Sequence, residues 1–191
     1  EQLVSRSGAK PGDLICVTGD LGSAYLGLQI LEREKQIYVS NPGIQPDLEE
    51  QDYLIGRFLK PEARKYMIDL FRQNNLVPTA MMDVSDGISS DLMHICKQSG
   101  VGAIIEEVGV PIHNDAKMQA LKFKLDPLTC ALNGGEDYEL LFTIDPKDVE
   151  KVRLLPDIYI MGEITERSEG VKLHSSGGKI HDLLAQGWRH F

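Results

Sequence analysis

Residues 80–96 constrain the fold of this chain more than any other stretch, because an apolar run, a polar turn and a helical pattern follow one another. The apolar lead-in at 80–82 is typical of a strand or extended segment. The turn holds two carboxylates, Asp83 and Asp86, with Ser85 between them. Apolar residues then recur at helical spacing, at Ile88, Leu92, Ile95 and Cys96. The stretch predicts a strand that turns sharply into a helix, with Ser85 or Asp86 as the N-cap.

The polar turn has the side chains expected of a metal–nucleotide site. A helix N-terminus favours a phosphate because its N–H groups are unpaired, but carboxylates beside it would repel a bare phosphate. A divalent cation resolves this conflict, since Mg²⁺ takes few oxygen ligands from protein and shares the rest with water and substrate phosphates. The alternative is an ordinary capped helix, because Asp and Ser are among the commonest caps. The spacing alone leaves both interpretations open.

Charge and cysteine usage exclude several classes of protein. The net charge of −9 argues against a nucleic-acid surface, which needs clustered Lys and Arg. The three cysteines, Cys16, Cys96 and Cys130, are far apart and show no zinc or disulfide spacing, so they fit buried thiols in a reducing cytoplasm. No apolar run reaches the length of a membrane span, and no signal peptide is visible. We therefore expect a cytoplasmic protein that contacts neither nucleic acid nor membrane.

The remaining pattern mixes strands and helices without regular alternation. The sequence predicts strands at 14–18, 101–106 and 158–164 and a hairpin at 171–180. It predicts helices at 24–33, 52–59, 63–73, 114–122 and 146–154, with Asn114 as a cap and a polar loop at 34–48. We expect one mixed α/β domain over residues 1–191, with a central mixed β-sheet flanked by helices.

A second marked stretch, residues 131–144, reads as a glycine-rich turn that enters a strand. If Tyr138, Leu140 and Phe142 share the buried face, Glu139 points to the opposite face. Glu139 and Asp137 are then poor candidates for ligand contacts. Glu136 remains the acidic candidate in the turn, although it can equally polarise the turn or pair with a nearby lysine.

Five segments in order carry a resemblance to a known family. They are residues 6–13, 17–19, 82–87, 134–140 and 187–191. Together they resemble the C-terminal domain of thiamine-monophosphate kinase, an enzyme of the superfamily of aminoimidazole ribonucleotide synthetase and selenophosphate synthetase. The resemblance extends over essentially the whole chain, so it implies the fold of that C-terminal domain.

The resemblance also implies a reaction and an incomplete chain. The family transfers the γ-phosphate of ATP to thiamine monophosphate, giving ADP and thiamine diphosphate, with Mg²⁺ and without a side-chain nucleophile. The family's N-terminal domain, with most metal ligands and the homodimer interface, is absent here. The implied roles are metal binding by Asp83 and Asp86, ATP binding by Arg6 and Ser85, and substrate binding by Glu136 and Trp188.

Other interpretations remain beside this one. Arg6 can be a solvated surface arginine, and Trp188 can be a core residue, because tryptophan is often largely buried. The whole protein can be another ATP-dependent enzyme of the same superfamily. Taken alone, residues 1–191 can act as a ligand-binding or assembly domain without turnover.

Overall fold

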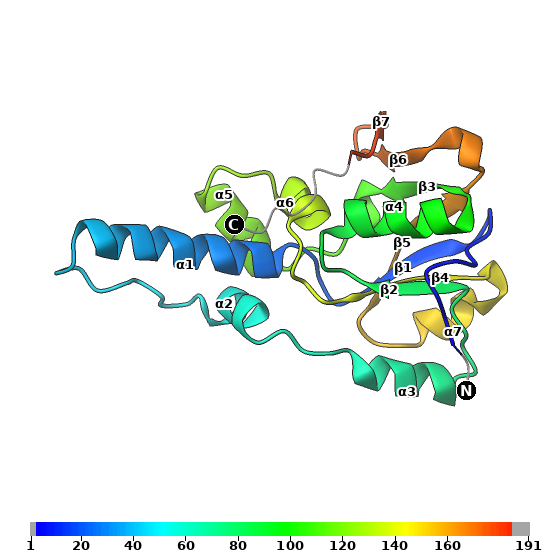
Figure 1. Ribbon diagram of the computed structural model, residues 1–191, viewed down its shortest axis with the longest axis horizontal. Coiled ribbons are helices and arrows are strands. Elements are labelled where there is room, and N and C mark those ends of the chain that lie inside the picture. The colour runs from blue at the N-terminus through cyan, green and yellow to red at the C-terminus, as the bar shows by residue number, and fades with distance from the viewer. Residues whose placement is uncertain (1–2, 185–191) are drawn as a thin grey trace.

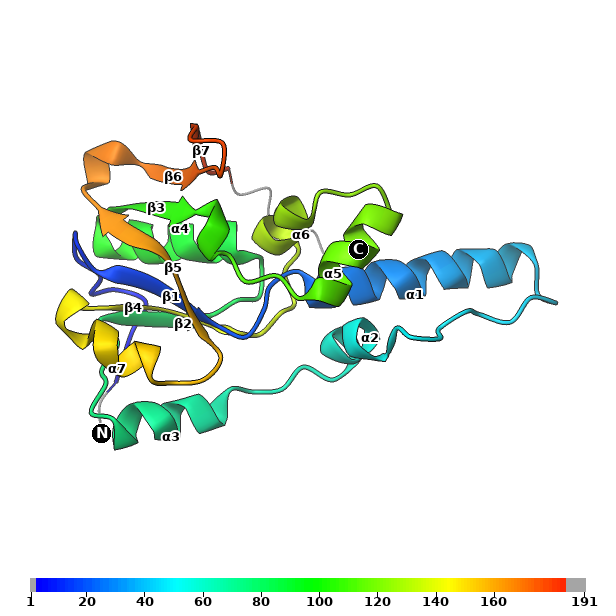
Figure 2. The same cartoon turned by 180° about the vertical axis from the view of Figure 1, so that it is seen from behind.

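The computed structural model describes residues 3–184, which form one seven-stranded sheet covered by helices (Figures 1 and 2). The order across the sheet is β2-β4-β1-β5-β3-β6-β7. Only the β3–β6 pair is parallel among the described pairs, so the sheet is mixed, as expected. The strands are β1 Leu14–Thr18, β2 Ala80–Asp83, β3 Gly102–Glu106, β4 Leu140–Ile144, β5 Ile158–Thr165, β6 Val171–His174 and β7 Ile180–Asp182.

Along the described part of the chain, the α-helices occur in the segments that connect these strands. They are α1 Ser23–Ser40, α2 Asp52–Leu59, α3 Lys65–Gln73, α4 Ile88–Ser99, α5 Asn114–Lys122, α6 Pro127–Asn133 and α7 Val149–Arg153. None of the helices in residues 3–184 is long and apolar enough to cross a bilayer.

Alternation along the central strands divides the core into two layers. In β1, Ile15 and Val17 pack with α4 on one face of the sheet, while Cys16 packs with α3 and α7 on the other. Phe142 of β4 is fully buried on the same side as Cys16. Each large apolar side chain removed from water in this way stabilises the fold by roughly 1.5–3 kcal/mol. The three cysteines within residues 3–184 are free and buried.

A third apolar cluster lies beyond the strand ends. Helix α1 runs away from the sheet, with α2 on one side and α5 and α6 on another (Figures 1 and 2). The cluster contains Leu26 and Ile30 of α1, Leu54 of α2 and Ala120 of α5. It fixes α2 and the start of α5 beside the sheet, and so positions the segments that carry the site.

Four adjacent strands, β2, β4, β1 and β5, have an end at the same side of the sheet, which we call the strand-end edge. The register pairs Asp83 at the end of β2 with Leu140 at the start of β4, and Thr18 at the end of β1 with Ile158 at the start of β5. The polar turns that follow β1 and β2, and those that precede β4 and β5, are therefore neighbours.

Helix α1 is longer than the sequence pattern indicated. The loop expected at 34–48 is helical up to Ser40, because the first helix-breaking residues are Pro42 and Gly43. Glu34 is buried and its Oε2 accepts a hydrogen bond from the Asp47 amide at 3.0 Å, which folds the following segment back against the helix.

Two expected caps are wrong, and the sequence pattern did not predict helix α6. His113, rather than Asn114, caps α5, with its Nδ1 accepting from the Asp115 amide at 3.2 Å. Helix α4 has Gly87 as its N-cap, with no side-chain cap bond, so neither Ser85 nor Asp86 fills that role.

Candidate functional site

The two marked stretches of the sequence lie side by side. Beyond the β2–β4 ladder, the Val84 amide donates to the Glu139 carbonyl at 2.8 Å, and the Tyr138 amide donates to the Val84 carbonyl at 2.8 Å. The Glu136 amide donates to the Ser85 carbonyl at 2.9 Å. Gly135 makes this approach possible, because its φ is +68° and a Cβ there would lie 2.7 Å from the Ser85 carbonyl oxygen.

This backbone pairing brings four of the sequence-predicted site residues into one group. Asp83 is exposed at the end of β2, whereas Ser85 and Asp86 are half-buried in the turn before α4. Glu136 is half-buried in the neighbouring turn. The group is therefore partly exposed to solvent at the strand-end edge.

Asp91, which the sequence analysis did not single out, shapes the turn that carries Asp83 and Asp86. Its Oδ2 accepts from the Ser85 amide at 3.0 Å and from the Asp86 amide at 3.2 Å. Asp91 lies four residues into α4 and is fully buried, so a side chain of the helix satisfies the amides that precede it. Burial raises the pKa of Asp91 to about 6. The Asp91 carboxylate thus fixes the backbone of the turn between Asp83 and α4.

Asp83 and Asp86 can supply part of the coordination of a Mg²⁺ ion, but not all of it. Asp83 and Asp86 offer hard oxygen donors, which Mg²⁺ prefers. Within residues 3–184, no group of three or more His, Cys, Asp or Glu side chains is placed to hold a metal ion. Mg²⁺ accepts such a site because it keeps several waters and shares substrate phosphates.

Side chains alternate in the turn that carries Glu136. Glu136 and Tyr138 face outward, whereas Asp137 and Glu139 are buried. This corrects the expectation that Tyr138 belongs to the buried face and Glu139 to the opposite one. The regular strand begins only at Leu140, so the alternation of a strand does not apply to Tyr138 and Glu139.

Asp137 joins this turn to the start of α1. Its Oδ2 accepts from the Gly22 amide at 2.8 Å, and its Oδ1 accepts from the Ala24 amide at 3.2 Å. These amides belong to a helix N-terminus that has no side-chain cap of its own. Burial raises the pKa of Asp137 to about 7, although the two amides and Arg57 act in the opposite direction.

Glu139 is the centre of a buried ionic cluster. Its Oε2 accepts from Thr18 Oγ1 and from Arg64 Nε, both at 2.6 Å, and its Oε1 accepts from Arg57 Nη2 at 2.7 Å. Arg64 makes a second, bidentate contact to Oε1. Gly19 leaves room for this carboxylate, since a Cβ at Gly19 would lie 2.2 Å from Oε1. The cluster ties β1, β4, α2 and the segment before α3 together.

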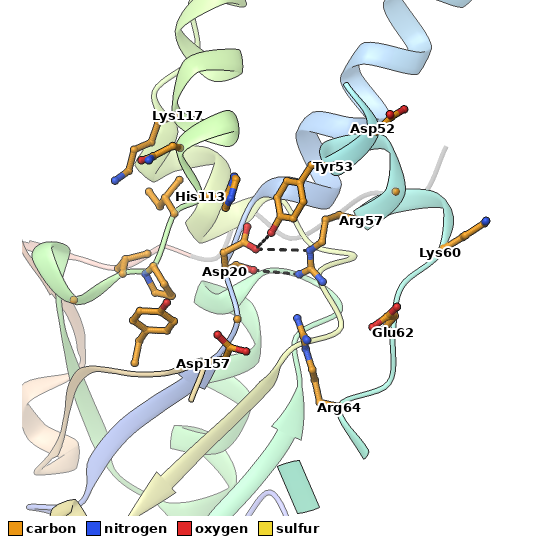
Figure 3. A pocket seen from close by; sticks show the side chains of 18 of the residues that line it. Asp20, Asp52, Tyr53, Arg57, Lys60, Glu62, Arg64, His113, Lys117 and Asp157 are labelled. Atoms are coloured by element: carbon orange, nitrogen blue, oxygen red, sulfur yellow. Dashed lines mark hydrogen bonds and ion pairs between the residues drawn. The ribbon is translucent and has the colours of Figure 1, made fainter. Parts of the chain in front are cut away.

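A cavity of about 910 Å³ opens beside the ionic cluster at the same sheet edge (Figure 3). Its walls come from α2, the β3–α5 connection, the turn after β1 and the start of β5. Figure 3 shows Asp20 facing Tyr53 and Arg57, with His113 next to Tyr53; the Tyr53 and His113 rings lie 4.1 Å apart. Arg57 Nη2 also donates to the Asp137 carbonyl at 3.2 Å, which links the cavity wall to the turn that carries Glu136.

The other two sequence-predicted site residues lie outside this group. Arg6 is exposed on the segment along β2, where the Ser5 carbonyl accepts from the Met81 amide at 2.9 Å. None of the interactions described for residues 3–184 joins the Arg6 side chain to Asp83 or Asp86. Trp188 lies outside the described residues.

A family match decides the relationship of the chain. The family described as AIR synthase related protein, C-terminal domain, matches residues 10–174. The chain belongs to this family.

Relatives within the AIR synthase related family cover the whole chain. Thiamine-monophosphate kinases of Aquifex aeolicus and Salmonella typhimurium are 37% and 41% identical to it, and each match covers 100% of this chain and 56% of the relative. The chain therefore spans about half the length of these curated relatives. The structure of AaThiL complexed with AMPPCP and TMP is 35% identical and superposes with a TM-score of 0.79, covering 100% of this chain and 55% of that one.

More distant structures share the fold alone. The hydrogenase maturation protein HypE of E. coli is 18% identical and superposes with a TM-score of 0.72, covering 98% of this chain and 53% of its own. The mixed α/β architecture expected from the sequence is confirmed by these superpositions and by the family match.

Proposed function

We propose that this chain is the C-terminal part of a thiamine-monophosphate kinase, which transfers the γ-phosphate of ATP to thiamine monophosphate. The observation that carries the proposal is the juxtaposition of Asp83, Ser85 and Asp86 with Glu136 at one sheet edge. The full-length similarity to thiamine-monophosphate kinases supports the same reaction.

The reaction needs two anions to meet. A phosphate oxygen of thiamine monophosphate attacks the γ-phosphorus of ATP, and the bond from that phosphorus to the β–γ bridging oxygen breaks, so ADP leaves. Such transfers depend mainly on positioning and on neutralising charge. Bound Mg²⁺, held by Asp83 and Asp86, would supply that neutralisation and align the phosphates.

The protein groups of the site have distinct roles in this proposal. Ser85 contacts the nucleotide, and Arg6 adds a guanidinium contact to the ATP phosphates. Glu136 accepts a hydrogen bond from the amino-bearing ring of thiamine. Trp188 stacks on the cationic ligand, a contact worth about 0.5–2 kcal/mol. No side-chain nucleophile is required, because the acceptor is the substrate itself.

The rest of the active site belongs, in this proposal, to a part of the protein outside this chain. The chain spans about half of its relatives, and its two metal-binding carboxylates are too few for several ions. We place the remaining metal ligands and the homodimer interface in an N-terminal domain that precedes residues 1–191. The free, buried cysteines suit a reducing cytoplasm.

The full-length protein that contains this chain tests the proposal. With Mg²⁺, ATP and thiamine monophosphate, we expect ADP and thiamine diphosphate in equal amounts. Asp83→Asn and Asp86→Asn should each lower kcat by at least tenfold, whereas Asp69→Asn on the exposed face of α3 should leave it unchanged. ADP release with another phosphate or acid acceptor, and none with thiamine monophosphate, would instead indicate a different enzyme of the superfamily.

A further inference from the structure

Tyr138 has a backbone conformation that a bulky side chain rarely adopts. Its φ is +50°, and two residues earlier Glu136 has a φ of +61°. Both lie in the left-handed region, where the Cβ crowds the backbone of an L-residue and costs free energy. Glycine would adopt either conformation without this cost. The strain therefore suggests a function for the Glu136 and Tyr138 side chains.

Backbone hydrogen bonds and the side chains of neighbouring residues hold Glu136 and Tyr138 in this conformation. The Glu136 and Tyr138 amides donate to the Ser85 and Val84 carbonyls. The residues that follow each of them, Asp137 and Glu139, are buried and anchored to α1 and to the two arginines. Anchors that point inward therefore force Glu136 and Tyr138 to point outward.

The outward side chains contact each other. The Tyr138 hydroxyl donates to Glu136 Oε2 at 3.2 Å, and the Tyr138 residue is 36% exposed. No described hydrogen bond uses Glu136 Oε1. Partial burial, together with the charges of Glu136, Asp83 and Asp86, raises the pKa of Tyr138, so its hydroxyl remains a donor at neutral pH.

We propose that Tyr138 is a positioning residue for Glu136: its hydroxyl holds Oε2 and so aims Oε1 at the amino-bearing heterocycle of the substrate. This inference rests on the proposed function and adds to it a residue that fixes substrate orientation. A carboxylate with two free oxygens rotates, whereas one held at a single oxygen presents the other in a defined direction. Preorganisation of this kind lowers the ordering cost of binding.

Kinetics of the full-length protein separate this role from a structural one. In Tyr138→Phe, the KM for thiamine monophosphate should rise roughly fivefold, because one hydrogen bond to a charged group is lost. The KM for ATP should not change. Tyr38→Phe, on the far part of α1, is the matched control and should leave both values unchanged.

A second pair of variants tests whether Tyr138 acts through Glu136. Glu136→Gln alone should raise the KM for thiamine monophosphate, and Tyr138→Phe should add little to it, because coupled residues are not additive. Independent, multiplicative effects would overturn the positioning role.

Stability provides the last readout. Tyr138→Gly removes the left-handed strain, so its urea midpoint should be no lower than that of the wild type, while the KM for thiamine monophosphate rises as in Tyr138→Phe. A lower midpoint together with an unchanged KM would show that Tyr138 is only structural. If the wild type itself does not phosphorylate thiamine monophosphate, the proposed function fails. If the wild type is active and Tyr138→Phe has the wild-type KM, the positioning role alone fails.

Discussion

At the scale of single residues, Glu139 is the side chain on which the strand-end edge depends. It is fully buried, and Arg57 and Arg64 both pair with it while themselves only slightly exposed. Taking these charges out of water is costly, so the cluster is stabilising only while all its members are present. Glu139 fixes Thr18, Arg57 and Arg64 relative to one another, so its removal should lower the stability of the fold substantially.

Glu139→Gln should lower the free energy of unfolding by about 3 kcal/mol, because two arginines lose the carboxylate that compensates them. Urea unfolding followed by circular dichroism measures this difference. Glu150→Gln provides the control, since the exposed Glu150–Arg153 pair contributes at most about 1 kcal/mol. Equal midpoints for the two variants would contradict the assignment of Glu139 as the central anchor.

Asp137 makes the stability of the fold depend on pH. Its folded-state pKa is raised from 3.8 to about 7, by burial first and by Asp20 to a smaller extent, against Arg57 and two amides. Between these values the folded state binds more protons than the unfolded state, so stability falls as pH rises from about 4 to 7.

Asp137→Asn cannot ionise and escapes this fall. The variant should be less stable than the wild type at pH 4. The asparagine side chain has one oxygen acceptor, whereas Asp137 accepts from the backbone N–H groups of Gly22 and Ala24 with two oxygens. The deficit should shrink steadily towards pH 8. Urea midpoints measured across this range test the sign, and a deficit that grows with pH would refute the raised pKa.

At the scale of elements, Arg57 joins helix α2 to the strand-end edge, in addition to the apolar packing of Leu54. Its guanidinium reaches the Asp20 carbonyl, the Asp137 carbonyl and the Glu139 carboxylate from a helix of only eight residues. So short a helix has little stability of its own and depends on such contacts.

Arg57→Met should therefore open α2 locally without unfolding the sheet. Hydrogen–deuterium exchange in residues 52–59 should accelerate at least tenfold, while exchange in α4 stays as in the wild type. Arg72→Met, on the exposed face of α3, should change neither segment. Uniform acceleration across the chain would mean that Arg57 supports global rather than local stability.

The elements themselves were largely predictable from the sequence, because they depend on local patterns. The strand at 14–18 and the helix at 52–59 begin and end where periodicity and breakers place them. Helix α6 shows a missed local signal, since Asp126 and Pro127 form a standard helix start and the Asp126 carboxylate accepts from the Thr129 amide.

The site was predictable only in part, for a physical reason. The resemblance pointed to Asp83, Ser85, Asp86 and Glu136, and the structure brings these four together, while their roles stay predictions. The anchors were not predictable, because Glu139, Arg57 and Arg64 meet only through tertiary contacts. Strand alternation over 138–142 predicts an outward Glu139, but the regular strand begins only at Leu140.

At the scale of the whole molecule, the exposure of the strand-end edge fits the proposal that it forms one half of an active site. Asp83 is exposed rather than enclosed, and the described residues supply no third carboxylate for the same ion. The cavity beside the ionic cluster opens at this edge too. A second protein part that covers the edge would enclose the phosphates and exclude water from them, which phosphoryl transfer requires.

This arrangement predicts a sharp difference between residues 1–191 and the full-length protein. Residues 1–191 alone should bind Mg–ATP weakly and show no turnover, because two carboxylates cannot neutralise the approach of two phosphate groups. Isothermal titration with an ATP analogue and Mg²⁺, together with an ADP-release assay, measures both quantities. The full-length protein, titrated in parallel, should bind more tightly and turn over, and chelation of Mg²⁺ should abolish its activity. Measurable kinase activity from residues 1–191 would mean that Asp83, Asp86 and Glu136 form a complete site, and the half-site model would have to be abandoned.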